Sequence, residues 1–484
     1  MAFTLVMGAC LVLSWMIGSS KPTIQGFFWG DQKISWRLSL SLILSSSFSL
    51  NGLLYQAWLG YLIGWWALLI QLVWCSSFVL LGYFSRKFRG LLDQGTMHGV
   101  IGSRFGVGAM KVAAFASVLG FAILIGWEAV VGATVIQNFV GQNATIYLAT
   151  PLALVLISSL YTGTGGLRGN AIINAAQNIF KIVILCGAAY YIFALPPASG
   201  SIFQAAKPVD LLTAIGLLGG VALAANLTFS LFWQIVDMSV WQNLSATPSE
   251  KRGVAIWASA VAVFLFPGVI GTVIGVGLSS IGGAVGEVTD TNILNQFVVA
   301  IGGEPAIALL LVGAFAASML STIDGYALAA AQATTWDLLF PKTVKRLLAL
   351  GGDRPANADD RKILAVGRGL VLVLAMGGAA AVLGLVMLGN VSLFDLVYAV
   401  VVAQMSLVGP VLLCLARPNG GQLKMGFAPI VAALAVGGVM ISGRFWGQPE
   451  FYTWAPVGTV AASLIVTLAL AALPKREPEV LVGD

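Results

Sequence analysis

The sequence predicts an all-α polytopic membrane protein with about 13 transmembrane helices. Hydrophobic residues make up 58% of the 484 positions and charged residues only 9%, whereas a soluble domain carries roughly 25% charged residues. Apolar runs of about 20 residues, the length that crosses a bilayer as a helix, recur along the chain. Alternating strand patterns are absent, and open sheets do not exist in lipid. The net charge of +6 therefore indicates basic loops and not a nucleic-acid partner.

The apolar runs give the order of the predicted helices. The spans lie near 2–18, 38–58, 61–83, 108–138, 146–163, 170–194, 211–240, 254–279, 304–337, 364–388, 393–416, 424–442 and 452–473. Only three connections are long, at 84–107, 280–303 and 338–363. No stretch of the chain predicts a separate soluble domain.

The basic residues predict the orientation of the spans. If the loops alternate between the two sides, all but three of the 25 Lys and Arg residues fall on one side. Lys207 and Arg444 lie on the other side, and Lys181 lies within a span. Because cytoplasmic loops carry the excess of Lys and Arg, we expect a multi-pass protein of the plasma (inner) membrane with its N-terminus outside and its C-terminus in the cytoplasm.

The second span has a polar centre, Ser45-Ser46-Ser47-Phe48-Ser49-Leu50-Asn51-Gly52. Backbone that leaves the helix at this depth is tolerated only where it lines a cavity or is buried in protein. Broken helices at mid-membrane hold ions and substrates in secondary transporters. Close packing of helices through small residues is the alternative explanation.

Hydroxyl groups cluster on one face of the ninth span. Ser318, Ser321 and Thr322 are spaced i, i+3, i+4, so they share a helix face. Hydroxyls and free carbonyls are oxygen ligands that hard cations accept. This face, set against the broken second span, predicts a small site for a monovalent cation. Hydrogen bonding that only holds the helices together is the competing interpretation.

The seventh span also has a polar centre, and its direction is opposite to that of the second. Each span begins a set of five, which is the trace of an inverted repeat with its site at the interface. We therefore expect a ten-helix core whose first and sixth helices are broken. Its halves would cover 38–194 and 211–416, with an extra helix at 1–20 and two peripheral helices at 424–473.

Four motifs of the chain resemble those of the sodium:solute symporter family. They are Tyr-Thr-Gly-Thr-Gly-Gly-Leu-Arg at 161–168, Asp-Met-Ser-Val-Trp-Gln-Asn-Leu-Ser-Ala at 237–246, Ser-Met-Leu-Ser-Thr-Ile-Asp at 318–324, and Thr-Met-His-Gly-Val-Ile-Gly-Ser-Arg-Phe-Gly at 96–106. They occur in the family's order and span most of the chain. The resemblance implies a sodium-coupled transporter with two inverted five-helix repeats.

The resemblance also implies positions for the sites. Sodium would bind the carbonyls of Ser47 and Leu50 together with the hydroxyls of Ser318, Ser321 and Thr322. The solute would bind beside the broken helices, at Ser49, Asn51, Gly52, Trp127, Glu128, Asn226, Trp233 and Asp237. Asp237 lies near the end of its span, where its carboxylate can also reach the membrane interface.

Three positions depart from the family's pattern. Asn174 stands where the family commonly has Asp, which makes a second sodium site doubtful. Gln242-Asn243 replaces a Gln-Arg pair. Lys181 lies about 16 Å into its span, at 1.5 Å per residue. If it faces the ion site, its ammonium would stand in for a cation and make transport sodium-independent; if not, it pairs with a neighbour or faces a wet vestibule.

The expected function is sodium-coupled symport of a small polar organic solute by alternating access. No cofactor other than the coupling sodium ion is expected, and the oligomeric state is not predicted. A proton-coupled or sodium-independent transporter using Lys181 or Glu128 is the first alternative, and a transporter-like sensor or inactive partner subunit is the second. An enzyme is not expected, because no nucleophile–base or metal-ligand spacing occurs and the single histidine, His98, is expected in a loop.

Overall fold

The computed structural model is built of helices. It describes residues 23–92, 95–140, 144–194, 209–281, 292–300, 305–349, 357–388, 393–417 and 426–472, with a few single residues besides. Within these ranges, nine helices are long and apolar enough to cross a membrane. The all-α, multi-pass fold class predicted from the sequence is therefore confirmed. The expected span at 2–18 lies largely outside the described residues.

The other twelve predicted spans each coincide with helical structure. The helices are α3 (Trp36–Ser47), α4 (Leu50–Ile63), α5 (Ala67–Leu92), α6 (Met97–Phe105), α7 (Val107–Val140), α8 (Ala144–Ala194), α10 (Leu211–Leu218), α11 (Gly220–Val236), α12 (Met238–Ser245), α13 (Arg252–Val263), α14 (Gly271–Ile281), α15 (Ile293–Ala300), α16 (Pro305–Ala333), α17 (Pro341–Ala349), α18 (Ala358–Met387), α19 (Leu393–Met405), α20 (Val408–Ala416), α21 (Ala428–Ser442), α22 (Pro449–Thr453) and α23 (Ala455–Ala472). Helix α8 covers two predicted spans and is interrupted between them by a kink at Gly166, whose φ of 57° suits glycine.

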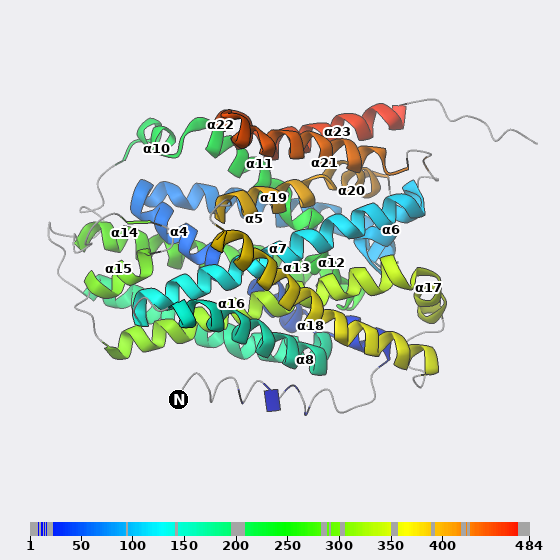
Figure 1. The fold of residues 1–484 in the computed structure, drawn as a ribbon, viewed down its shortest axis with the longest axis horizontal. Coiled ribbons are helices and arrows are strands. Elements are labelled where there is room, and N and C mark those ends of the chain that lie inside the picture. The colour runs from blue at the N-terminus through cyan, green and yellow to red at the C-terminus, as the bar shows by residue number, and fades with distance from the viewer. Residues whose placement is uncertain are drawn as a thin grey trace, which may run out of the picture.

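Several short helices lie near the two ends of the bundle. Helices α6 and α17 lie at one end, and α10, α14 and α15 lie near the other (Figure 1). α6 and α17 belong to the two long basic connections, and α15 belongs to the long connection 280–303, which has no Lys or Arg. α10 and α14 lie at the ends of predicted spans that adjoin connections with few basic residues. This arrangement agrees with the predicted alternation of sides; which end faces the cytoplasm stays a prediction.

The helix break predicted at Ser45–Gly52 is confined to two residues. α3 ends at Ser47, and Phe48 leaves the helical conformation with ψ of 47°. Ser49 is extended and caps α4, because its hydroxyl accepts a hydrogen bond from Gly52 N at 2.9 Å. Serine is a preferred N-cap because its side chain satisfies an amide that has no helical partner. The break therefore exposes the last carbonyls of α3 and the first amides of α4.

The corresponding break in the seventh span lies at Asp237. This residue is extended, with ψ of 106°, between α11 and α12. Its carboxylate accepts from the amide and hydroxyl of Ser239, at 2.8 and 2.6 Å. The structure thus places Asp237 as the N-cap of α12, and this role accounts for a buried carboxylate near the end of the span.

His98 differs from its expected place in a loop. It lies in α6 and is fully buried. Its Nδ1 is 2.9 Å from an oxygen of Asp337, and its Nε2 is 2.8 Å from Ser117 Oγ. Thr96 donates to the other Asp337 oxygen at 2.8 Å. The sequence prediction was wrong because Thr96 caps a helix within the connection that looked irregular.

Helices α7 and α18 approach closely through glycine. A Cβ on Gly126 would lie 2.5 Å from the carbonyl oxygen of Gly378, and a Cβ on Gly378 would collide with the carbonyl of Ala122. Small residues at such crossings let backbones come together in membranes. The adjacent Gly377 has no atom near its added Cβ.

These neighbouring glycines provide a matched test of the crossing. Gly378→Ala should lower the free energy of unfolding by about 1–3 kcal/mol, because overpacking forces the backbones apart. Gly377→Ala should leave stability unchanged or raise it slightly, since alanine is the better helix former. Melting temperatures of the two variants in detergent measure the difference, and equal melting temperatures would contradict the close approach.

Candidate functional site: a broken helix with a cation side and a cavity side

The carbonyl end of α3 is contacted by a lysine. Lys181, on α8, is fully buried and donates from Nζ to the carbonyl oxygen of Phe48 at 3.4 Å and to Ser321 Oγ at 3.0 Å. Its ammonium also lies 4.9 Å from the centre of the Phe48 ring. One positive charge therefore connects the broken helix to α8 and α16.

The hydroxyl face predicted on α16 meets the same end of α3. Thr322 donates to the carbonyl oxygen of Ser45 at 3.2 Å and to that of Ser318 at 2.9 Å. Ser321 donates to the Ser318 carbonyl at 3.0 Å. The hydroxyl of Ser318 has no hydrogen-bond partner among the described residues. Of these groups, the hydroxyl of Ser321 also accepts from the ammonium of Lys181.

A buried carboxylate supports the lysine from α16. Asp324 accepts from Tyr161 Oη at 2.8 Å and from Asn174 Nδ2 at 3.2 Å. Asp324 follows Ser321, the residue whose hydroxyl accepts from Lys181 Nζ, by three residues on α16. Since a buried charge needs partners, this carboxylate helps to explain how an ammonium is retained inside the bundle.

A polar stripe on α8 leads to Lys181. Asn170, Asn174, Gln177 and Asn178 lie at helical spacing before it and are all at least nine-tenths buried. Asn178 is bonded to the carbonyl and hydroxyl of Ser41, at 2.9 and 3.0 Å. In contrast, both polar side-chain atoms of Asn170 and of Gln177, and the Oδ1 of Asn174, have no hydrogen-bond partner among the described residues. Buried polar atoms of this kind are usually bridged by ordered water.

The amide end of α4 is contacted by a carboxylate. Glu128, on α7, is 2% exposed and accepts from Leu50 N at 2.7 Å. Its other oxygen accepts from Asn51 Nδ2. A carboxylate is favoured at a helix N-terminus because the free amides and the helix dipole both attract negative charge. Glu128 and Lys181 thus bind opposite ends of the same break.

A cavity of about 380 Å³ lies beside the break, within the usual size of small-molecule sites. Most of its lining comes from α3, α4, α5, α7, α11, α16 and α19. Of the predicted site residues, those lining it are Ser47, Ser49, Asn51, Gly52, Trp127, Glu128, Asn226, Trp233 and Thr322. Asp237, Leu50, Ser318 and Ser321 do not line it.

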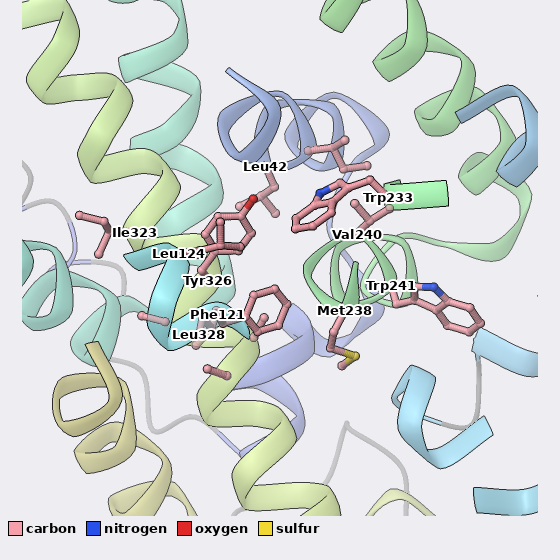
Figure 2. Packing of buried hydrophobic residues seen from close by; sticks show 14 of the residues in the cluster. Leu42, Phe121, Leu124, Trp233, Met238, Val240, Trp241, Ile323, Tyr326 and Leu328 are labelled. Carbon is pink, nitrogen blue, oxygen red and sulfur yellow. The ribbon is translucent and has the colours of Figure 1, made fainter. Parts of the chain in front are cut away.

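Aromatic rings form much of the cavity wall. Trp74 stacks on Trp233 with their centres 6.1 Å apart, and Phe229 lies against both, at 5.2 and 4.9 Å. Tyr326 lines the cavity and stacks on Phe121 at 5.2 Å, next to Leu124 (Figure 2). Trp74 and Phe229 were not among the predicted site residues, since an aromatic residue in an apolar span gives no signal of its own.

The carbonyls predicted to bind sodium were those of Ser47 and Leu50. In the structure, Lys181 donates to the carbonyl of Phe48 and Thr322 donates to the carbonyl of Ser45. Each contacted carbonyl lies two residues before the predicted one, which follows from where α3 ends; the sodium ligands themselves stay a prediction. Leu50 belongs to the cavity side of the break, where its amide donates to Glu128.

No protein-family model and no curated protein sequence matches the chain. Solved structures do match. The chain is similar to a Na+-coupled sialic acid symporter in a substrate-bound, outward-open state, with a TM-score of 0.76, 14% identity, and coverage of 97% of this chain and 96% of that one. It is also similar to Mhp1, a nucleobase-cation-symport-1 family transporter in a closed conformation with bromovinylhydantoin bound, with a TM-score of 0.52, 14% identity, and coverage of 92% and 94%. At this identity the likeness establishes the fold alone, which this chain shares with both of these transporters.

An electrostatic interaction between the buried groups of Lys181 and Asp324 predicts a non-additive double mutant. Lys181→Met and Asp324→Asn should each lower the melting temperature, because each leaves the other group without its opposite charge. The double variant should recover about 1–3 kcal/mol relative to the sum. Lys345→Met, at an exposed lysine, combined with Asp324→Asn serves as the additive control. Additivity in both pairs would show that the two buried charges do not interact.

Proposed function

We propose that the chain is a secondary active transporter of a small organic solute and that the ammonium of Lys181 takes the place of the coupling cation. The observation that carries this proposal is the contact of Lys181 Nζ with Ser321 Oγ and Phe48 O, at 3.0 and 3.4 Å. The motif resemblance favours the sodium:solute symporter family, within which this chain would be sodium-independent. The proposed location is the plasma membrane, with the N-terminus outside.

A lysine can perform the structural task of a bound cation. Its ammonium supplies one positive charge and three donors to the oxygens around it. Here it joins α8, α16 and the broken helix α3, which are elements that have to separate for alternating access. The solute would bind in the cavity beside the same break.

Proton transfer is the proposed source of coupling. When Lys181 loses its proton, the charge that holds α3 against α16 disappears, and the two elements are free to move apart. The polar stripe from Asn170 to Asn178 offers a hydrated route for that proton, since its unpartnered amide atoms can bind water. Glu128 would link the solute site to the lysine, because it binds the amide end of the same break whose carbonyl end Lys181 binds.

Sodium-coupled symport is the second candidate. It is favoured by the likeness to the Na+-coupled sialic acid symporter and by the unpartnered hydroxyl of Ser318. Ser318, Ser321 and Thr322 would then be sodium ligands, as the sequence predicts. This function requires the ammonium of Lys181 to leave the hydroxyls before sodium binds.

Sodium itself distinguishes the two candidates without knowledge of the solute. The melting temperature of the wild-type protein should be the same in sodium chloride and in choline chloride of equal ionic strength. Lys181→Ala should create a sodium-dependent rise in melting temperature, because it empties a site lined by oxygen atoms. A ligand at 100 times its Kd stabilises by about 2.7 kcal/mol, which a thermal scan resolves.

The matched control is Lys345→Ala, which removes an exposed lysine from α17 and should behave as the wild type. Sodium-dependent stabilisation of the wild type, lost in Ser321→Ala and Thr322→Ala, would establish sodium symport in place of the lysine mechanism.

A further inference from the structure

We propose that the transported solute is an aromatic compound without a carboxylate, either neutral or positively charged. This inference rests on the proposed function, since it assumes that the cavity beside the break is the transport site. Three features of that cavity carry it: the occupied amide end of α4, the absence of basic side chains among the described residues that line it, and the aromatic wall.

The first feature is that the protein supplies its own carboxylate to the broken helix. The amide end of a half-helix at mid-membrane is where anionic substrate groups are attracted. In this chain Glu128 accepts from Leu50 N at 2.7 Å and also from the Asn51 side chain. Ser49 accepts from Gly52 N at 2.9 Å. A solute carboxylate would therefore meet amides that already have partners.

The second feature is the charge of the cavity wall. Among the described residues that line it, Glu128 is the only charged one, and none is Lys, Arg or His. The ammonium of Lys181 is directed to Phe48 and Ser321 on the other side of the break. An anionic solute would be desolvated against a like charge, which costs several kcal/mol, whereas an amine would gain an opposite charge.

The third feature is the arrangement of rings. Trp74, Phe229 and Trp233 contact one another on one wall, and Trp127 lines the cavity beside Glu128. Flat rings stack on such side chains, and cations are attracted to their faces within about 6 Å. The side chains of Ser49 and Asn51 line the cavity at the break, where they can orient a solute that carries donors or acceptors.

Four probes that each carry one indole ring but differ in charge separate the effect of solute charge from that of ring shape. They are tryptamine, a cation; indole-3-acetamide, which is neutral; tryptophan, a zwitterion; and indole-3-acetate, an anion. Binding is measured by calorimetry with the full-length protein in detergent, in choline chloride and in sodium chloride of equal ionic strength. Tryptamine and indole-3-acetamide should bind at least about tenfold more tightly than indole-3-acetate, since each 1.4 kcal/mol corresponds to a factor of ten. Tryptophan should bind more weakly than tryptamine.

Glu128→Gln tests the cause of this order. The amide keeps the shape of the side chain and an acceptor for Leu50 N but removes the charge. Indole-3-acetate should gain affinity and tryptamine should lose it, each by about tenfold, while indole-3-acetamide changes little. Glu250→Gln, at an exposed glutamate, should leave all four affinities unchanged.

The proposal is overturned if wild-type protein binds indole-3-acetate as tightly as tryptamine and the acetamide, or if it binds none of the four probes in either salt. Binding that appears only in sodium chloride bears on the lysine mechanism and not on the solute class. A sodium-stabilised wild type that still prefers tryptamine would refute the lysine mechanism alone, and a sodium-indifferent wild type that prefers indole-3-acetate would refute the solute class alone.

Discussion

The contact between the Lys181 ammonium and the carbonyl of Phe48 is the interaction on which the site depends. It satisfies a backbone group that the break in the second span leaves unpaired, in a place where an unsatisfied carbonyl is costly. At the other side of the break, Glu128 does the same for the amide of Leu50. The two ends of one broken helix are thus neutralised by two side chains of the chain itself, and the cavity beside them is left with an aromatic wall.

Much of the fold follows from the sequence, because bilayer thickness and backbone satisfaction leave few choices. Apolar run length identified twelve spans that coincide with helices, and the four serines around Phe48 marked the break. The capped helix at His98 was missed, since apolar periodicity carries little information in a short interfacial segment. The inverted-repeat boundaries remain predictions, although the breaks near Phe48 and at Asp237 fit them.

The sequence predicts which polar residues take part in the candidate site, but not which partner each of them contacts. Polar residues in apolar spans drew attention to Glu128, Lys181 and the α16 hydroxyls, because each has an insertion cost that requires a partner. Which partner each one takes depends on helix rotation and on where α3 ends, and neither is encoded in residue spacing. Asp237 looked like a cavity residue for this reason, yet it caps α12. Trp74 and Phe229 gave no signal among other apolar residues.

The central claim, that a lysine occupies the cation position of the broken helix, is tested most directly by cryo-electron microscopy of the wild-type protein in sodium chloride and in choline chloride. The account predicts the same map in both salts, with density continuous from the Lys181 side chain to a point between Ser321 Oγ and the Phe48 carbonyl. A Lys181 side chain turned away from that point in sodium, with a separate peak held by Ser318, Ser321 and Thr322, would contradict it.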